Sequence, residues 1–138
     1  MIIKTLRLKD EKEEIFESFE LIADLGVKGD VKAKGGDRQL CLADEDLLNE
    51  YRECGKGVCV HRFMPNITTV GLDYTALKEG DKFKIGDTEI EISSTLKKCF
   101  PECEFVQSGN VCQIKKACAF ARITKSGTIS AGDEIIEI

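Results

Sequence analysis

Residues 77–93 have the sequence LKEGDKFKIGDTEIEIS, and this stretch decides the fold class. Two Gly-Asp pairs, which begin at Gly80 and Gly86, separate short segments in which apolar and polar residues alternate. Glycine permits the φ values that tight turns need, and aspartate bonds to nearby backbone, so each pair predicts a turn. Lys82–Ile85 and Thr88–Ser93 have the strand period of two. The stretch therefore predicts short strands joined by turns.

The same pattern recurs along most of the chain. Gly29-Asp30 and Gly132-Asp133 repeat the turn pair. Apolar and β-branched segments predict further strands at Ile2–Leu8, Gln39–Leu42, Val58–Phe63, Ala119–Ile123 and Glu134–Ile138. Many short strands separated by turns favour a mainly β sandwich or barrel over parallel strands that alternate with helices.

Helical periodicity is scarcer. Glu45–Arg52 has three apolar residues at helical spacing, and Gly55 follows as a C-terminal stop. Asp10–Asp24 also places apolar residues on one side, which fits either a short helix or a loop between strands. We predict one or two short helices within a single domain that spans residues 1–138.

Composition narrows the function classes. A net charge of −5 disfavours nonspecific nucleic-acid binding. The chain has no run of eighteen apolar residues that would cross a membrane, and its N-terminus lacks the pattern of a secretory signal. We therefore expect a cytoplasmic protein with neither nucleic acid nor membrane as a partner. The odd count of seven cysteines argues against a full disulfide framework there.

Four cysteines are concentrated near the C-terminal end and are accompanied by lysine pairs: Cys99, Cys103, Cys112 and Cys118, with Lys97-Lys98 and Lys115-Lys116. Ammonium groups favour the thiolate, which is the form of cysteine that acts as a nucleophile or metal ligand. Residues 94–125 hold six basic residues against two acidic ones, which suits either a phosphorylated small molecule or a solvated basic face.

Two alternatives remain open for these thiols. Cys41 and Cys118 stand in apolar surroundings, so they are either functional or small buried hydrophobic residues. The four late cysteines are separated by three, eight and five residues, which is looser than the paired spacing of structural zinc sites. A cysteine-rich domain stabilised by zinc is therefore an alternative to a reactive thiol.

Three segments together resemble a MOSC domain, the domain type at the C-terminus of molybdenum cofactor sulfurases. The first is Gly29-Asp30 followed by GDRQL at 36–40, and the second is PNITTVGLD at 65–73, which leads into residues 77–87. The third is CFPEC at 99–103, followed by ARI at 121–123 and residues 127–133. Their order and spacing resemble the short stand-alone bacterial members over residues 26–138. The resemblance implies a β-barrel-like domain.

The resemblance also implies that the protein handles sulfur or the molybdenum cofactor (molybdopterin) through a cysteine. In the related mitochondrial amidoxime-reducing component, a cysteine at a strand end binds molybdenum directly. That cysteine corresponds here to Cys103, just after the turn that Pro101 would make, or to Cys99. The resemblance and the basic residues together give a candidate cofactor-binding set of Arg38, Gln39, Asn66, Thr68, Thr69, Lys97, Lys98, Lys115 and Arg122. Residues 66–69 alone are also typical of a turn with local side-chain bonds.

The chain departs from the family in two places and lacks one activity. Lys32 stands where members often carry histidine, and Pro65 stands where an acid is common. The larger sulfurases carry a pyridoxal-phosphate-dependent desulfurase domain, and 138 residues leave no room for one. The implied partners are therefore a cysteine desulfurase as sulfur donor and a molybdoenzyme as acceptor. The expected role is sulfurtransferase-like, with a non-catalytic cofactor-delivery module as the alternative.

Overall fold

The computed structural model describes residues 1–7, 15–29, 35–36, 38–54, 65–95 and 117–138. These residues form two sheets and one helix, α1 (Glu45–Cys54). In spatial order, the eight-stranded sheet contains β11 (Ile135–Glu137), β7 (Lys82–Ile85), β8 (Thr88–Ser94), β9 (Cys118–Lys125), β5 (Leu40–Asp44), β6 (Ile67–Val70), β1 (Ile2–Arg7) and β2 (Ile15–Phe16). The smaller sheet contains β10 (Gly127–Ser130), β3 (Ser18–Ile22) and β4 (Gly26–Val27).

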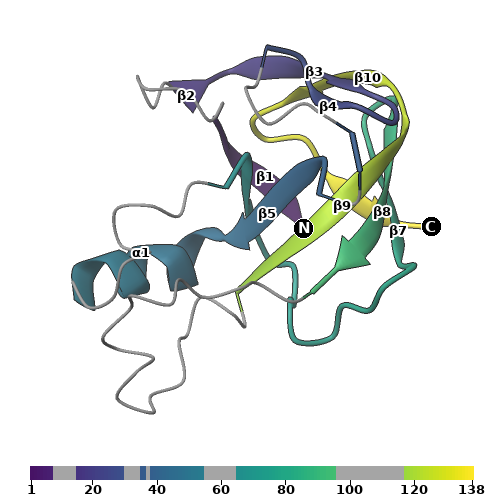
Figure 1. Cartoon of the computed structure of the whole chain (residues 1–138). Helices are drawn as coiled ribbons and strands as arrows, with labels where there is room; N and C mark the ends of the chain where they lie inside the picture. The colour runs from purple at the N-terminus through teal and green to yellow at the C-terminus, as the bar shows by residue number, and fades with distance from the viewer. Residues whose placement is uncertain (8–14, 30–34, 37, 55–64, 96–116) are drawn as a thin grey trace.

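The large sheet curls until its two sides nearly meet, so the prediction of a mainly β, barrel-like fold is confirmed (Figure 1). The two sides are joined at a seam between β1 and the chain leading into β11. Ile2 forms a bridge with Glu134, and the Ile3 N–H donates to the Asp133 carbonyl at 2.9 Å. This closure leaves few unpaired backbone groups along β1, which limits the exposed edge of the sheet.

The hairpin of β7 and β8 forms as its sequence predicts. The strands pair from Lys82 opposite Glu91 to Ile85 opposite Thr88, with Gly86-Asp87 as the turn between them. Gly86 has φ +58°, which glycine adopts at little cost. The Thr88 hydroxyl donates to the Ile85 carbonyl at 2.6 Å and fixes the turn.

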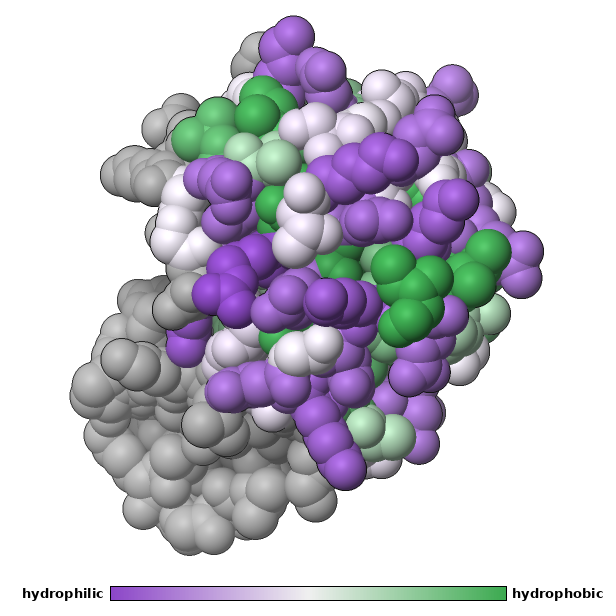
Figure 2. Space-filling view, turned by 90° about the vertical axis from the view of Figure 1, so that its right-hand side faces the viewer, coloured by the Kyte–Doolittle hydropathy of each residue, from purple (hydrophilic) through white to green (hydrophobic). Residues whose placement is uncertain are grey.

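Alternation along the strands divides the sheet into an inner and an outer face. The inner side chains form one hydrophobic core with Phe19, Leu21 and Ile129 of the smaller sheet. Burying such side chains contributes about 1.5–3 kcal/mol each, so this core is the main stabilising term. On the outer face, opposite charges stand across from each other, as at Lys84–Glu89 and Glu89–Lys125. Figure 2 accordingly shows a surface in which hydrophilic residues dominate and hydrophobic patches are separate.

Two sequence interpretations are wrong. Within Asp10–Asp24, the residues from 15 onwards form β2 and β3, not a helix. Phe19 and Leu21 alternate into the core, and pairing with β10 and β4 overrides the helical spacing. Residues 67–70 are also not a local turn. They form the buried strand β6 between β5 and β1, because both neighbours supply backbone partners.

The remaining strand predictions hold where the structure describes them, and α1 is found where the periodicity of Glu45–Arg52 predicts it. The strand predicted at Val58–Phe63 lies outside the described residues. Among the described residues, no helix has the length and apolar character that crossing a bilayer requires.

Candidate functional site

The outer face of β5, β9 and β8 gathers polar and sulfur-bearing side chains. In β9, Ala119, Ala121 and Ile123 belong to the core, so the alternating residues Phe120 and Arg122 belong to the opposite face. Pairing places Cys41 and Ser94 beside Phe120, and Glu91 beside Arg122. We call the set Arg38, Cys41, Glu91, Ser94, Phe120 and Arg122 the outer site.

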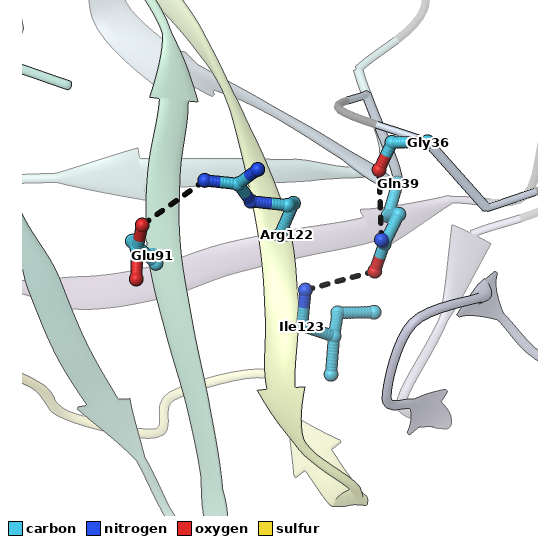
Figure 3. A network of polar contacts seen from close by, with 5 residues as sticks. All are labelled: Gly36, Gln39, Glu91, Arg122 and Ile123. Atoms are coloured by element: carbon cyan, nitrogen blue, oxygen red, sulfur yellow. Dashed lines mark hydrogen bonds and ion pairs between the residues drawn. The ribbon is translucent and has the colours of Figure 1, made fainter. Parts of the chain in front are cut away.

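Arg38 and Arg122 both belong to the face of the sheet that carries Phe120. The Arg38 guanidinium lies over the Phe120 ring, with Cζ 4.3 Å from the ring centroid. Arg122 follows Phe120 by two residues on the same face, and its Nη2 lies 3.1 Å from Glu91 Oε1. Figure 3 shows the pair formed by Arg122 and Glu91. Their side chains are 42% and 25% exposed, so this ion pair contacts solvent. The outer site thus presents two guanidinium groups held by neighbouring side chains.

Gln39 fixes the chain beside Arg38. Its Oε1 accepts the Ile123 N–H at 3.0 Å, and its Nε2 donates to the Gly36 carbonyl at 2.8 Å (Figure 3). The side chain is only 6% exposed. Both ends of the amide are therefore bonded within the protein, and they attach the start of β5 to β9. This attachment positions the backbone from which Arg38 projects.

Asn66 likewise forms hydrogen bonds that connect β5 and β1. Its Oδ1 accepts the Cys41 N–H at 3.0 Å, and its Nδ2 donates to the Arg7 carbonyl at 3.3 Å. Its own backbone N–H donates to the Cys41 carbonyl at 2.9 Å. Because the side chain is buried, these bonds hold the start of β6 in register with both neighbours.

The two threonines of β6 point to opposite faces. The Thr68 hydroxyl lies 2.5 Å from the Thr5 hydroxyl and accepts the Thr5 N–H at 3.1 Å, where the pairing of β1 and β6 shifts register. The Thr69 hydroxyl lies 2.8 Å from the Tyr74 hydroxyl in the core. Burial raises the pKa of Tyr74 well above its ordinary value, so the phenol stays neutral.

Cys41 and Cys118 are buried thiols in adjacent strands, and neither forms a disulfide. Cys41 lies opposite Phe120 and Cys118 lies opposite Ala43, so the two thiols are diagonal neighbours on the outer face. Cys41 and Cys118 are 4% and 2% exposed. For both residues, the interpretation as small buried hydrophobic residues fits this burial.

Several predicted site residues lie outside the described residues: Cys99, Cys103, Lys97, Lys98 and Lys115, with Cys112 and Lys116. The segment that carries them joins Thr95, after β8, to Ala117, before β9. Ser94 pairs with Phe120, and the Ala117 carbonyl accepts the Asp44 N–H at 2.8 Å. Both attachment points of the segment therefore adjoin the outer site.

The sequence interpretation missed Phe120 and Glu91. Alternation in 118–123 contained a usable signal, because Ala119, Ala121 and Ile123 define one face and leave Phe120 beside Arg122 on the other. Glu91 had no such signal, since its contact with Arg122 depends on the register between β8 and β9. In the part of the chain that the structure describes, no group of three or more histidine, cysteine or acidic residues is arranged to hold a metal ion.

Comparison with known proteins agrees with the mainly β, barrel-like fold. The family model described as "MOSC domain" matches residues 30–136. The YuaD protein from Bacillus subtilis has a similar structure, with 19% identity, a TM-score of 0.70, and coverage of 98% of this chain and 94% of that chain. YiiM from Escherichia coli is 21% identical with a TM-score of 0.68, and covers 100% of this chain and 70% of its own. These TM-scores show a shared fold. No curated protein matches this sequence significantly.

Proposed function

Because the chain belongs to the MOSC domain family, we propose that it binds the molybdenum cofactor, or passes sulfur to it, through Cys103 or Cys99. The family is generally linked to proteins related to the molybdenum cofactor sulfurases. The proposed partners are a cysteine desulfurase as sulfur donor and a molybdoenzyme as acceptor. We place the protein in the cytoplasm.

The observation that carries the proposal is the presence of two guanidinium groups, those of Arg38 and Arg122, on the face of the sheet that contains Phe120. Molybdopterin carries one phosphate and a dithiolene. Arginine binds phosphate through several N–H donors in one plane. Arg38 and Arg122 are oriented by Phe120 and Glu91. The donor set of the outer site therefore fits the phosphate end of the cofactor, and Lys97, Lys98 and Lys115 would add positive charge.

Four of the predicted cofactor-binding residues have a structural role in this proposal. Gln39, Asn66, Thr68 and Thr69 are buried, and their side chains bond to other parts of the protein. We infer that they position the strands behind the outer site. Breaking their bonds to reach a ligand would leave buried donors and acceptors unpaired, at about 1–3 kcal/mol each.

The reactive cysteine lies close to this site along the chain. Cys99 follows Thr95 by four residues, and four residues of extended chain span at most about 14 Å. In the proposed transfer, its thiolate, or that of Cys103, attacks the terminal sulfur of the donor's persulfide. The donor's S–S bond breaks, the donor leaves as a thiolate, and the acceptor cysteine becomes a persulfide, with no net oxidation. When bound, the cofactor supplies the metal centre that receives sulfur.

Mass spectrometry after incubation with a cysteine desulfurase and cysteine tests the proposal. We expect a mass gain of one sulfur atom that is lost in Cys103→Ser or in Cys99→Ser and retained in the matched control Cys112→Ser. A gain that persists in the double variant Cys99→Ser/Cys103→Ser would exclude both thiols as the carrier. Cofactor binding without a persulfide would instead identify a delivery module.

A further inference from the structure

A second feature lies away from the outer site, at the seam of the sheet. The loop between β6 and β7, the start of β1 and the end of β11 enclose an open pocket of about 330 Å³. This volume falls within the range of small-ligand pockets and exceeds that of one extended side chain. None of the proposed cofactor-binding residues lines it.

The floor of the pocket is apolar and firmly packed. Leu72, Leu77 and Phe83 line it and are 7%, 9% and 2% exposed. All three also belong to the hydrophobic core, so the floor is continuous with the interior. An aliphatic group that entered the pocket would therefore pack on an apolar floor that is already formed. Its own apolar surface would be removed from water, which is favourable.

The rim carries three carboxylates, of Asp73, Asp81 and Glu137. Asp73 Oδ1 accepts the Thr75 N–H at 3.0 Å, and Asp81 Oδ2 accepts the Lys78 N–H at 2.9 Å. These bonds fix both carboxylates in the loop. The hydrogen bonds from Thr75 also hold the pKa of Asp73 below its ordinary value, so it is ionised at neutral pH.

The charge of the lining is negative. Its three carboxylates stand against one α-amino group, that of Met1. A matching ligand combines an aliphatic stem with a terminal cation, because the stem packs on the floor while the cation stays among the carboxylates. Lysine and arginine side chains have this construction.

We propose that this pocket is a docking site for a lysine or arginine side chain on the surface of a partner protein. The inference goes beyond the proposed function, because it concerns recognition alone and requires no sulfur transfer. The pocket lies at the same end of the sheet as the two residues that bracket the cysteine segment. β5 and β6 are parallel and β9 is antiparallel to β5, so the pocket beyond β6 lies at the sheet end where β9 begins. Thr95 and Ala117, which bracket the cysteine segment, lie at the same end.

The test is a titration of the full ¹⁵N-labelled protein, followed by backbone amide shifts. The probe is the capped tripeptide acetyl-Gly-Lys-Gly-amide, and the uncharged probe has norleucine in place of lysine. We expect saturable shifts at Leu72, Ala76 and Leu77 with the lysine peptide and at least tenfold weaker binding of the norleucine peptide. The variant Asp73→Asn/Asp81→Asn/Glu137→Gln keeps the side-chain acceptors that fix the loop, and should also bind about tenfold more weakly, as expected from losing exposed ion pairs.

Two controls separate a pocket from general attraction to an acidic protein. Glu17→Gln/Glu50→Gln/Asp87→Asn removes the same charge from exposed positions elsewhere and should leave the affinity unchanged. Ala76→Leu fills the pocket but keeps its charge, and should reduce binding. Equal losses in both triple variants, or full binding by Ala76→Leu, would overturn the proposal.

Two further measurements address other occupants. Cadaverine is a free diamine with the lysine stem, and tenfold tighter binding of cadaverine than of the peptide would assign the pocket to a free cation, against the proposal. Sedimentation of the unlabelled protein tests for a second copy. A dimer that the Asp73→Asn/Asp81→Asn/Glu137→Gln variant dissociates would likewise overturn it.

Discussion

Arg38 lies over the ring of Phe120, 4.3 Å from guanidinium carbon to ring centroid, and this contact joins the loop before β5 to the first half of β9. It explains why an exposed arginine has a defined position over β9. It also brings together two residues that stand more than eighty positions apart in the sequence.

Arg38→Ala should impair ligand binding far more than stability. A cation–π contact at an exposed site contributes about 0.5–1 kcal/mol to folding, whereas a charge-assisted bond to phosphate contributes about 1.5–3 kcal/mol. We expect roughly tenfold or greater loss of affinity for the molybdenum cofactor in anaerobic calorimetry. Phe120→Leu, which keeps apolar bulk but removes the ring, should cause a smaller loss. Unchanged affinity in both variants would place the phosphate elsewhere.

Glu91→Gln should strengthen anion binding by Arg122. The carboxylate beside Arg122 lowers the positive potential there, and the pair is partly exposed, so its loss should cost folding less than about 1 kcal/mol. We expect a severalfold gain in cofactor affinity at low salt. The gain should shrink as the salt concentration rises, because the Debye length falls. The matched control is Glu89→Gln, two residues away on the same face. An equal gain in both variants would indicate net charge rather than the ion pair.

Gln39→Ala should destabilise the fold by about 1–3 kcal/mol, because the buried Ile123 N–H loses its acceptor. Denaturant unfolding measures the change, and faster hydrogen exchange at the Ile123 amide would localise it. The control is Asn49→Ala, whose exposed bond to Glu45 lies on α1. That change should alter the unfolding free energy by less than about 0.5 kcal/mol. Similar losses in both variants would mean that Gln39 does not anchor β5 to β9.

The Thr69–Tyr74 pair predicts a signature at alkaline pH. The folded state raises the pKa of Tyr74 above the unfolded value of about 10, so the folded state retains a proton that the unfolded state releases. This contribution to stability is complete below pH 10 and is lost as the pH rises further. Tyr74→Phe should therefore show a shallower fall in unfolding free energy above about pH 10. An identical pH profile would show that Tyr74 does not titrate abnormally.

Thr69→Val tests the same pair without titration. It leaves a buried phenol without its hydroxyl partner and should cost about 1–3 kcal/mol. The double variant Thr69→Val/Tyr74→Phe removes both polar groups and should lose less than the sum of the two single changes. Additive losses in denaturant unfolding would argue against a direct bond.

The zinc-stabilised alternative predicts bound zinc in a metal analysis, whereas the proposal of a carrier thiol predicts none. The described strands already enclose a continuous apolar core, so we expect no stoichiometric zinc after dialysis and no change in Tm with a chelator. Retained zinc with unfolding on chelation would favour the structural site and would contradict a free carrier thiol.

The sequence by itself determined the elements whose signals are local. The β7–β8 hairpin and α1 follow from alternation, turn residues and helical spacing within a few positions of each other. The apolar neighbours of Cys118 along the chain fit its burial but left a functional thiol as an alternative. The three resembling segments are enough to identify the MOSC family, because motif order and spacing are properties of the chain.

Only the tertiary structure decided the identity of β6 and the composition of the outer site. β6 is a strand because β5 and β1 supply its backbone partners, and both lie far from it in sequence. The sequence predicts Gln39 and Asn66 as cofactor ligands, and only the structure shows that their side chains bond to Ile123, Cys41 and Arg7 of other strands. Hydrogen bonds across a sheet depend on register, and register is set by how all the strands pack around the core.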